Sequence, residues 1–299
     1  MSNSAPAPKP AKIGRAIFSS ALKNVNKDRF VLLYPMIGFV ATTGFAALLL
    51  IPIVSTFPIW VNDDNLMGIE MIAFVILTSV FGGFTHVLAQ AGVMASANLR
   101  YSGQTPTFTS SSKEAKANLK NLALFGLLEA SVGLVLRALR DNLKAAGDLL
   151  SFIGGFAWAV ASYFAIPAIL FEGLGPIASI RRSTEIIKAK WGSALRVNLF
   201  ANFAFIVAIF IAFGVLMSGM YLFASAATGT LAEMFLGIWV VLGGLALLWL
   251  VILVQSTVMS YACVALYRYA QNQTSDGFDA TLLPNAFKLK QQKFVGLKS

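Results

Sequence analysis

The residues best suited to bind a ligand lie in one stretch, residues 164–192, where an apolar run ends at Glu172 and a pair of arginines follows. The guanidinium groups of Arg181 and Arg182 can pair with phosphate, and the Glu172 carboxylate can hold one of them in position. The pattern indicates a site for a phosphate-bearing headgroup or a protein partner. Its candidate residues are Glu172, Arg181, Arg182, Lys188, Lys190 and Trp191. The alternative is architectural: Glu172 caps the next helix, and the basic side chains extend to lipid headgroups.

A second candidate is Glu129, a carboxylate well inside an apolar run with the sequence FGLLEASVGLVLR. A carboxylate in hydrocarbon is costly, so its default interpretation is functional, here a relay for protons or cations. Arg137 lies about two turns further along a similar face of the same helix, which makes the two residues a candidate intramembrane polar site. The alternative is that Glu129 reaches headgroup water or pairs with another helix.

Little else in the chain offers chemistry. There is one histidine, His86, and one cysteine, Cys263, and both lie in apolar runs. They cannot build an intrachain disulfide, a cysteine-held iron–sulfur cluster or a His/Cys zinc site, so no metal and no cofactor is expected. The sequence contains no phosphate-binding glycine loop, no H-E-x-x-H and no G-x-S-x-G. We therefore do not expect an enzyme.

The elements that carry these residues follow from composition. Of the 299 residues, 57% are hydrophobic and 12% are charged, about half the charged share of soluble domains. This indicates an all-α, polytopic membrane bundle. Because hydrocarbon about 30 Å thick needs roughly 20 apolar residues per helix, the apolar runs predict six spans. They lie at about residues 30–53, 67–97, 119–136, 149–171, 194–223 and 234–267.

The net charge of +10 predicts orientation rather than nucleic-acid binding. Every Lys and Arg lies in the N-terminal segment, the second-to-third and fourth-to-fifth connections or the C-terminal segment, apart from three exceptions. These are Arg137, Arg140 and Lys144, between the third and fourth spans. Six crossings with both termini cytoplasmic satisfy the pattern. Residues 1–11 are predicted to be a disordered tail, residues 12–270 a single membrane domain and residues 271–299 a second cytoplasmic tail.

Two basic segments have helical amphipathic patterns. Residues 12–29 divide into an apolar half and a basic half, and residues 177–191 place Ile177, Ile180, Thr184, Ile187 and Trp191 on one stripe. Both are predicted to be cytoplasmic interfacial helices. For the first segment, packing against the protein's own surface is an equally good interpretation. Small residues at Gly82, Gly83, Gly92, Gly155, Gly214, Gly243 and Gly244 indicate where helices approach closely.

The connection after the fourth span is the most specific feature. Pro167 removes a backbone donor inside the span and favours a kink there. Beyond Glu172, Gly173 and Gly175 permit a tight turn, and Pro176 suits the first residue of a new helix. The segment therefore predicts a span, a sharp turn and an interfacial helix.

This arrangement resembles the signature of an uncharacterised bacterial six-span integral-membrane protein family. It is also distantly similar to membrane domains found with glycerophosphodiester phosphodiesterases. The resemblance continues in Lys27-Asp28-Arg29 leading to Pro35, and in ALYRYA at residues 265–270. It implies a six-span fold in a bacterial cytoplasmic membrane and no known activity. The residues that carry the resemblance are Pro167, Glu172, Gly173, Gly175, Pro176, Ala178, Arg181, Arg182, Ser183, Trp191 and Gly192.

Three functions are compatible with these features. The first is a non-catalytic membrane protein that interacts with lipid or assists the assembly of a membrane complex, because the distinctive residues lie at the cytoplasmic interface. Its expected partners are anionic lipid headgroups and either a membrane-protein partner or a second copy of the chain. The alternative is a small secondary transporter that uses Glu129, and the third is a membrane-embedded enzyme.

Overall fold

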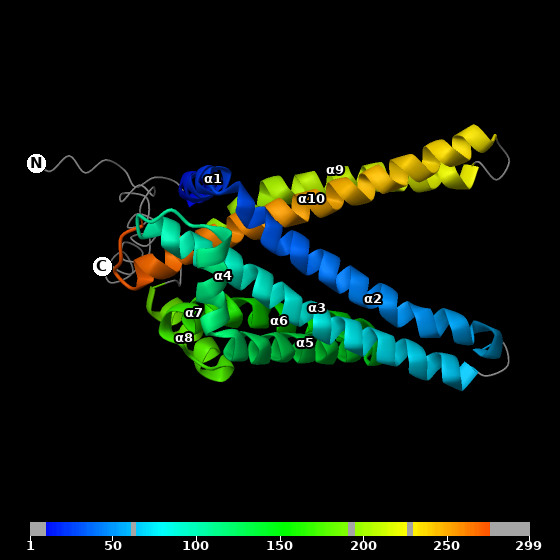
Figure 1. The fold of residues 1–299 in the computed structure, drawn as a ribbon, viewed down its shortest axis with the longest axis horizontal. Helices are drawn as coiled ribbons and strands as arrows, with labels where there is room; N and C mark the ends of the chain where they lie inside the picture. The colour runs from blue at the N-terminus through cyan, green and yellow to red at the C-terminus, as the bar shows by residue number, and fades with distance from the viewer. Residues whose placement is uncertain (1–9, 61–63, 191–194, 226–229, 276–299) are drawn as a thin grey trace, which may run out of the picture. The chain divides into compact units, whose positions relative to one another are not determined.

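The computed structural model describes residues 10–60, 64–190, 195–225 and 230–275, and the secondary structure within these ranges is helical throughout. The predicted all-α fold is confirmed. The helices (Figure 1) are α1 Pro10–Lys27, the 3-10 helix η1 Arg29–Leu32, α2 Leu33–Trp60, α3 Asp64–Tyr101, α4 Phe108–Ala117, α5 Leu119–Asn142, α6 Lys144–Ser162, α7 Ala165–Glu172, α8 Pro176–Lys190, α9 Leu195–Ser225 and α10 Leu231–Ala270.

Six helical stretches among the described residues are long and apolar enough to cross a membrane. The prediction of six spans is therefore confirmed at the level of length and composition. The third span, expected over residues 119–136, is longer because α5 continues to Asn142, which gives it a length of about 36 Å. The six stretches are Arg29–Ser55, Gly68–Tyr101, Leu119–Asn142, Ala146–Glu172, Phe205–Ser225 and Leu231–Ala270.

The chain divides into two compact units. Among the described residues, unit 1 contains α1, α9 and α10 as far as Ala262, and unit 2 contains η1, α2 to α8 and the chain from Cys263 onward. The boundaries of a single membrane domain and two tails stay predictions. α1 begins at Pro10, inside the predicted first tail, and most of both tails lies outside the described residues.

Unit 1 is a helical hairpin with α1 packed against it. The apolar face of α1 buries Ile17, Ala21 and Val25, and the Phe18 ring meets that of Phe205 on α9 edge to face, with centroids 5.3 Å apart. Of the two interpretations of residues 12–29, the one that agrees with these contacts is packing of the helix against the protein's own surface. α9 and α10 approach so closely that a Cβ on Gly219 would lie 2.6 Å from the backbone N of Val241.

Unit 2 is built around α3, which packs against α2, α4, α5 and α7. Val87 on α3 and Leu122 and Phe125 on α5 are fully buried in its core. The side chains of Asn118 and Asn121 donate to the backbone oxygens of Leu170 and Gly173, which brings the start of α5 beside the end of α7. α4, α7 and α8 therefore gather at one end of unit 2 (Figure 1), which we call the basic end.

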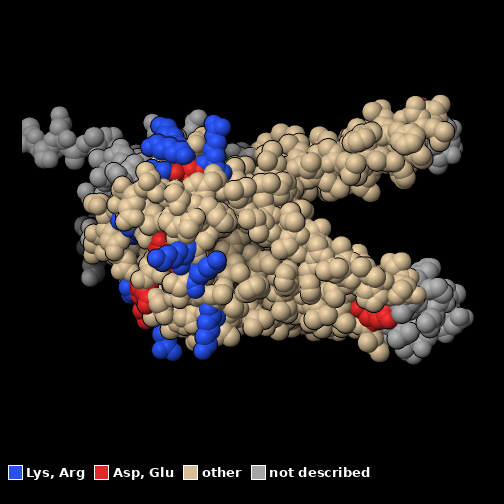
Figure 2. All heavy atoms as spheres, viewed as in Figure 1, with Lys and Arg blue, Asp and Glu red and all other residues tan. Residues whose placement is uncertain are grey.

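Lysine and arginine side chains on the viewed face of unit 2 gather at the basic end, over α4 and α8, and none appears at the far ends of α2 and α3 (Figure 2). Arg137 and Arg140, two of the three basic residues that depart from the predicted charge pattern, lie in the last turns of α5. Both are exposed and lie 3.7 and 3.6 Å from the Asp141 carboxylate, which partly offsets their charge.

The fourth span breaks where Pro167 predicts a kink. α6 ends at Ser162 and α7 begins at Ala165, so the turn between them includes Tyr163. In a continuous helix the Tyr163 carbonyl would accept from the N–H of residue 167, but Pro167 has no N–H. The Cys263 thiol donates to this carbonyl at 3.3 Å, and the Phe164 N–H donates to the Ser183 hydroxyl at 3.0 Å. Side chains from α10 and α8 therefore provide the hydrogen bonds that the helix lacks at the break.

We expect Ser183→Ala to destabilise unit 2 by about 1–3 kcal/mol, because it removes the buried acceptor of the Phe164 N–H. The matched control is Ser179→Ala on the same helix. Ser179 is also fully buried, but its hydroxyl donates locally to the Pro176 carbonyl, so its loss should cost less. Thermal unfolding of the two variants in the same detergent measures the difference. Equal losses would show that Ser183 does not support the break.

The turn from α7 to α8 follows the prediction. α7 ends at Glu172, and Gly173 has φ +68°, a left-handed conformation that favours glycine. Pro176 is the first residue of α8. Ser179, Ser183 and Ile186 of α8 are buried against the protein, whereas Ile177 of the predicted stripe is 63% exposed. Two of the buried positions are serines whose hydroxyls bond to backbone, which hydrophobic periodicity does not register.

Candidate functional site

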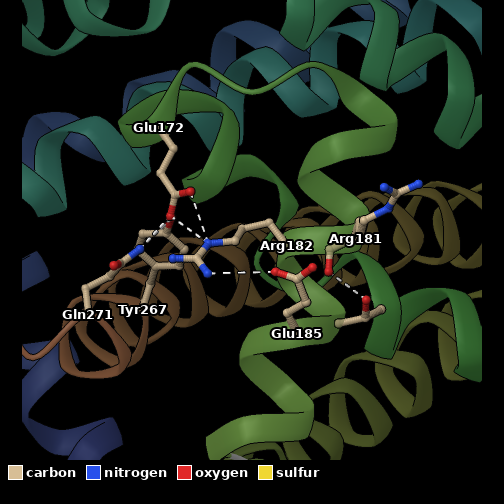
Figure 3. A network of polar contacts seen from close by, with 7 residues as sticks. Glu172, Arg181, Arg182, Glu185, Tyr267 and Gln271 are labelled. Atoms are coloured by element: carbon tan, nitrogen blue, oxygen red, sulfur yellow. Dashed lines mark hydrogen bonds and ion pairs between the residues drawn. The ribbon is translucent and has the colours of Figure 1, made fainter.

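Glu172 is the centre of a polar network at the basic end (Figure 3). Its carboxylate accepts hydrogen bonds from the Tyr267 hydroxyl and from Nε2 of Gln271, at 2.5 Å in the second case. Arg182 Nε lies 3.0 and 3.1 Å from the two carboxylate oxygens. The network joins the end of α7 to α8 and to the C-terminal end of α10, three segments that are far apart in the sequence.

The ion pair is partly shielded from solvent, because the side chains of Arg182 and Glu172 are 35% and 26% exposed. Its hydrogen bond to Glu172 raises the pKa of Arg182 above the ordinary value, so this guanidinium stays charged at physiological pH. A second carboxylate, that of Glu185, lies 3.9 Å from Arg182 Nη1. Arg182 is therefore held in position from two sides.

Arg268 forms a second cluster next to the first. Its Nη1 donates to Asn98 Oδ1 at 2.8 Å and to the Ser102 hydroxyl at 2.9 Å, and its Nε and Nη2 donate to the Thr274 carbonyl. All of these acceptors are uncharged. One of these acceptors is linked to a carboxylate in turn, because Asn98 Nδ2 donates to Glu114 at 3.2 Å. Burial raises the pKa of Glu114, although the hydrogen bond from Asn98 lowers it.

The two clusters line a common pocket of about 360 Å³. Its wall contains two guanidinium groups and one carboxylate, so its formal charge is positive, and the remaining polar side chains are amides and the Tyr267 hydroxyl. Donors that surround a small polar space are suited to an anion such as phosphate. The lining residues are Asn98, Phe171, Glu172, Arg182, Tyr267, Arg268, Gln271 and Gln273, and we call this space the polar pocket.

The sequence-based site is brought together in part. Glu172 and Arg182 pair as proposed, whereas Arg181 is exposed on α8 and does not line the polar pocket (Figure 3). Lys188 is also exposed and away from the pocket lining. Trp191 and the side chain of Lys190 lie outside the described residues.

Sequence reasoning missed the part of the pocket wall that belongs to other helices, above all Tyr267, Arg268, Gln271 and Asn98. Tyr267 and Arg268 belong to the ALYRYA segment, which carried part of the resemblance, and Gln271 follows it directly. That segment was the available signal, but no spacing rule connects it to Glu172, more than 90 residues away.

The candidate intramembrane polar site of Glu129 and Arg137 stays a prediction. Arg137 lies 3.7 Å from the Asp141 carboxylate, one turn further along α5, rather than beside Glu129. Glu129 is half-buried, has no hydrogen-bond or ion-pair partner in the described part of the chain and does not line the polar pocket. Its role as a relay stays a prediction.

These elements define a multi-pass helical membrane protein with a polar site at one end of its spans. Residues 68–278 match the model of a family of unknown function (DUF6159), and the chain belongs to that family. The expectation of an uncharacterised family is thereby confirmed, whereas the similarity to phosphodiesterase-associated membrane domains stays a prediction. No curated protein matches the chain.

Proposed function

We propose that this protein binds the phosphate group of an anionic membrane lipid in the polar pocket, and that it acts by binding, as a lipid-interacting or accessory protein of a membrane complex. The observation that carries the proposal is Arg268. Its charge is met by neutral acceptors among the described residues, in a pocket that also holds Arg182. An anion that entered the pocket would compensate the charge that Glu172 leaves unmatched.

The position of the polar pocket at the ends of candidate spans supports a lipid headgroup as the anion. Glu172 closes one candidate span, and Tyr267 and Arg268 lie in the last turn of another. Polar groups at the ends of spans lie at the level of headgroups. We further propose that the basic end is cytoplasmic, in a bacterial inner membrane with both termini inside, because basic residues concentrate on that side and anionic lipids attract them.

We expect Arg268→Gln to weaken binding of phosphatidylglycerol about ten-fold, because a charge-assisted hydrogen bond to phosphate is lost. The full-length protein in neutral detergent would be titrated with short-chain phosphatidylglycerol and, separately, with phosphatidylcholine. Arg181→Gln is the matched control, since Arg181 is exposed on α8 outside the pocket and its loss should change little. Arg268→Lys, which keeps the charge, should retain most of the affinity.

Two outcomes would contradict the proposal. If Arg181→Gln weakens binding more than Arg268→Gln does, the exposed face of α8 binds the lipid and the pocket does not. If inorganic phosphate or glycerol phosphate displaces the lipid at equal concentration, the pocket is an anion site with no lipid preference. Thermal unfolding of each variant separates a lost contact from a lost fold.

A further inference from the structure

A second pocket, of about 480 Å³, lies between α2, α3, α4 and the start of α5 within unit 2. Its floor is apolar, formed by side chains such as Ala41, Phe84, Leu88 and Ala89. Its volume falls in the range of about 300–1,000 Å³ that is typical of ligand pockets. We call it the apolar groove.

The apolar groove opens to the outside of unit 2 along its length. Three of its lining residues, Ile37, Phe108 and Leu119, are 53%, 40% and 44% exposed. Two of its walls are candidate membrane spans, α2 and α3, so its opening faces hydrocarbon rather than water when these helices cross a bilayer. A groove in that position is filled by whatever surrounds the spans, and in a bilayer that is the acyl chain.

The apolar groove has a polar end and an apolar end. Along α2 it extends from Tyr34 to Ala41, and along α3 from Gly92 back to Phe84, a length of about 12 Å. Its first end is at the basic end of unit 2, beside Ser112 and Lys116 of α4. Going inward from there, its lining becomes entirely apolar except for Thr85.

Lys116 provides a charge at the mouth of the apolar groove. It is exposed, and its ammonium group makes no ion pair or hydrogen bond with any described residue. By contrast, the nearby Tyr34 hydroxyl is engaged, since it donates to the Phe108 carbonyl at 3.0 Å and lies 3.0 Å from the Ser112 hydroxyl. These contacts fasten α4 over the groove and leave the lysine available to an anion.

We propose that the apolar groove holds one acyl chain of an anionic phospholipid, with the phosphate of that lipid paired with Lys116. A lysine that pairs with no described residue, beside an apolar channel about 12 Å long, matches the charge and the shape of such a lipid. This site is separate from the polar pocket, since the two have no lining residue in common. The proposal for the apolar groove is therefore independent of the proposed function of the polar pocket.

The test uses the full-length protein in vesicles that contain either phosphatidylglycerol or phosphatidylcholine with a photoreactive group on one acyl chain. Labelled peptides are then identified by mass spectrometry. We expect phosphatidylglycerol to label residues 84–92 preferentially over the exposed far half of α2. Ala41→Phe, which places a ring in the groove, should lower this labelling several-fold. The matched control is Ala47→Phe, since Ala47 is exposed on the same helix and does not line the groove.

Lysine variants test the headgroup half of the proposal. Lys116→Gln should lower labelling by phosphatidylglycerol about five-fold and labelling by phosphatidylcholine by less, because one lysine–phosphate attraction is lost and the choline group of phosphatidylcholine already offsets its phosphate charge. Lys113→Gln, also exposed on α4 but outside the groove lining, should change neither. Arg268→Gln should leave groove labelling intact even if it abolishes binding in the polar pocket.

Three results would overturn the proposal: labelling spread evenly over the lipid-facing surface, equal labelling of Ala41→Phe and Ala47→Phe, or crosslinks from residues 84–92 to a second copy of the chain. The last result would mean that a neighbouring protein helix fills the groove. Thermal unfolding of Ala41→Phe ensures that reduced labelling reflects a filled groove, and loss of labelling by Lys116→Gln without loss of stability stands as the independent readout.

Discussion

Replacing Asp28 by asparagine is expected to lower the free energy of unfolding of unit 2 by about 3–5 kcal/mol. The Asp28 side chain is only 3% exposed, and its two carboxylate oxygens accept hydrogen bonds from Nε of Arg100, at 2.8 Å, and from Nη2. The pair ties the start of η1 to the last turn of α3. The change takes away a counter-ion of the partly buried Arg100, and breaking one side of a buried ion pair costs more than the pair itself contributes.

The control is Asp141→Asn, which also removes a carboxylate paired with arginine. Asp141 and its partners Arg137 and Arg140 are all more than half exposed, so this change should cost no more than about 1 kcal/mol. Calorimetric unfolding in one detergent compares the two directly. If Asp28→Asn is no less stable than Asp141→Asn, water or another group solvates Arg100 and the pair is not structural.

The second large effect is expected at Gly126, where α5 crosses α3. A Cβ at this position would lie 2.9 Å from the Cα of Phe84 and 3.2 Å from the Gly83 carbonyl oxygen, and backbone atoms cannot move aside as side chains do. We expect Gly126→Ala to force the helices apart and to cost about 1–3 kcal/mol.

Gly133→Ala is the control, and its expected effect on stability is zero or opposite in sign to that of Gly126→Ala. Gly133 lies two turns later on α5, and a methyl group added there would have nothing within 4 Å, so alanine should be neutral or should stabilise the helix by up to about 1 kcal/mol. The two variants differ by one methyl group each, in the same helix. Equal thermal stability of both would show that α3 and α5 are not in backbone contact.

The contrast between these glycines illustrates what sequence could predict. Small-residue patterns pointed correctly to Gly83, Gly92 and Gly244, each of which faces a neighbouring helix closely. They pointed equally to Gly214 and Gly243, which have open space beside them, and did not single out Gly126 or Gly219. A glycine pattern records that close packing is allowed, whereas the crossing point depends on which helices meet.

The same limit applies to the polar pocket. Apolar length predicted six spans, and Pro167, Glu172 and Gly173 predicted the break and turn, because these are local effects of the backbone. The pairing of Glu172 with Arg182 was also accessible, since both residues belong to one short segment. Arg268 and Gln271 were not, because only tertiary packing brings the end of α10 to α7.

The buried serines of α8 could not be predicted for a related reason. Their hydrogen-bond partners are backbone groups, and in the case of Ser183 that group belongs to the break before α7.

The break in the fourth span also sets an order of events during synthesis. The thiol that bonds to Tyr163 belongs to a residue made 100 positions later, and the Tyr267 and Gln271 groups that surround Glu172 are made 95 and 99 positions later. When the ribosome has finished α7 and α8, it has not yet made Cys263, which bonds to the break, or the residues that form the far wall of the polar pocket. A nascent chain released before α10 is complete would carry Glu172 and Arg182 but not the far wall of the polar pocket, so the binding proposed for this pocket would require the last helix.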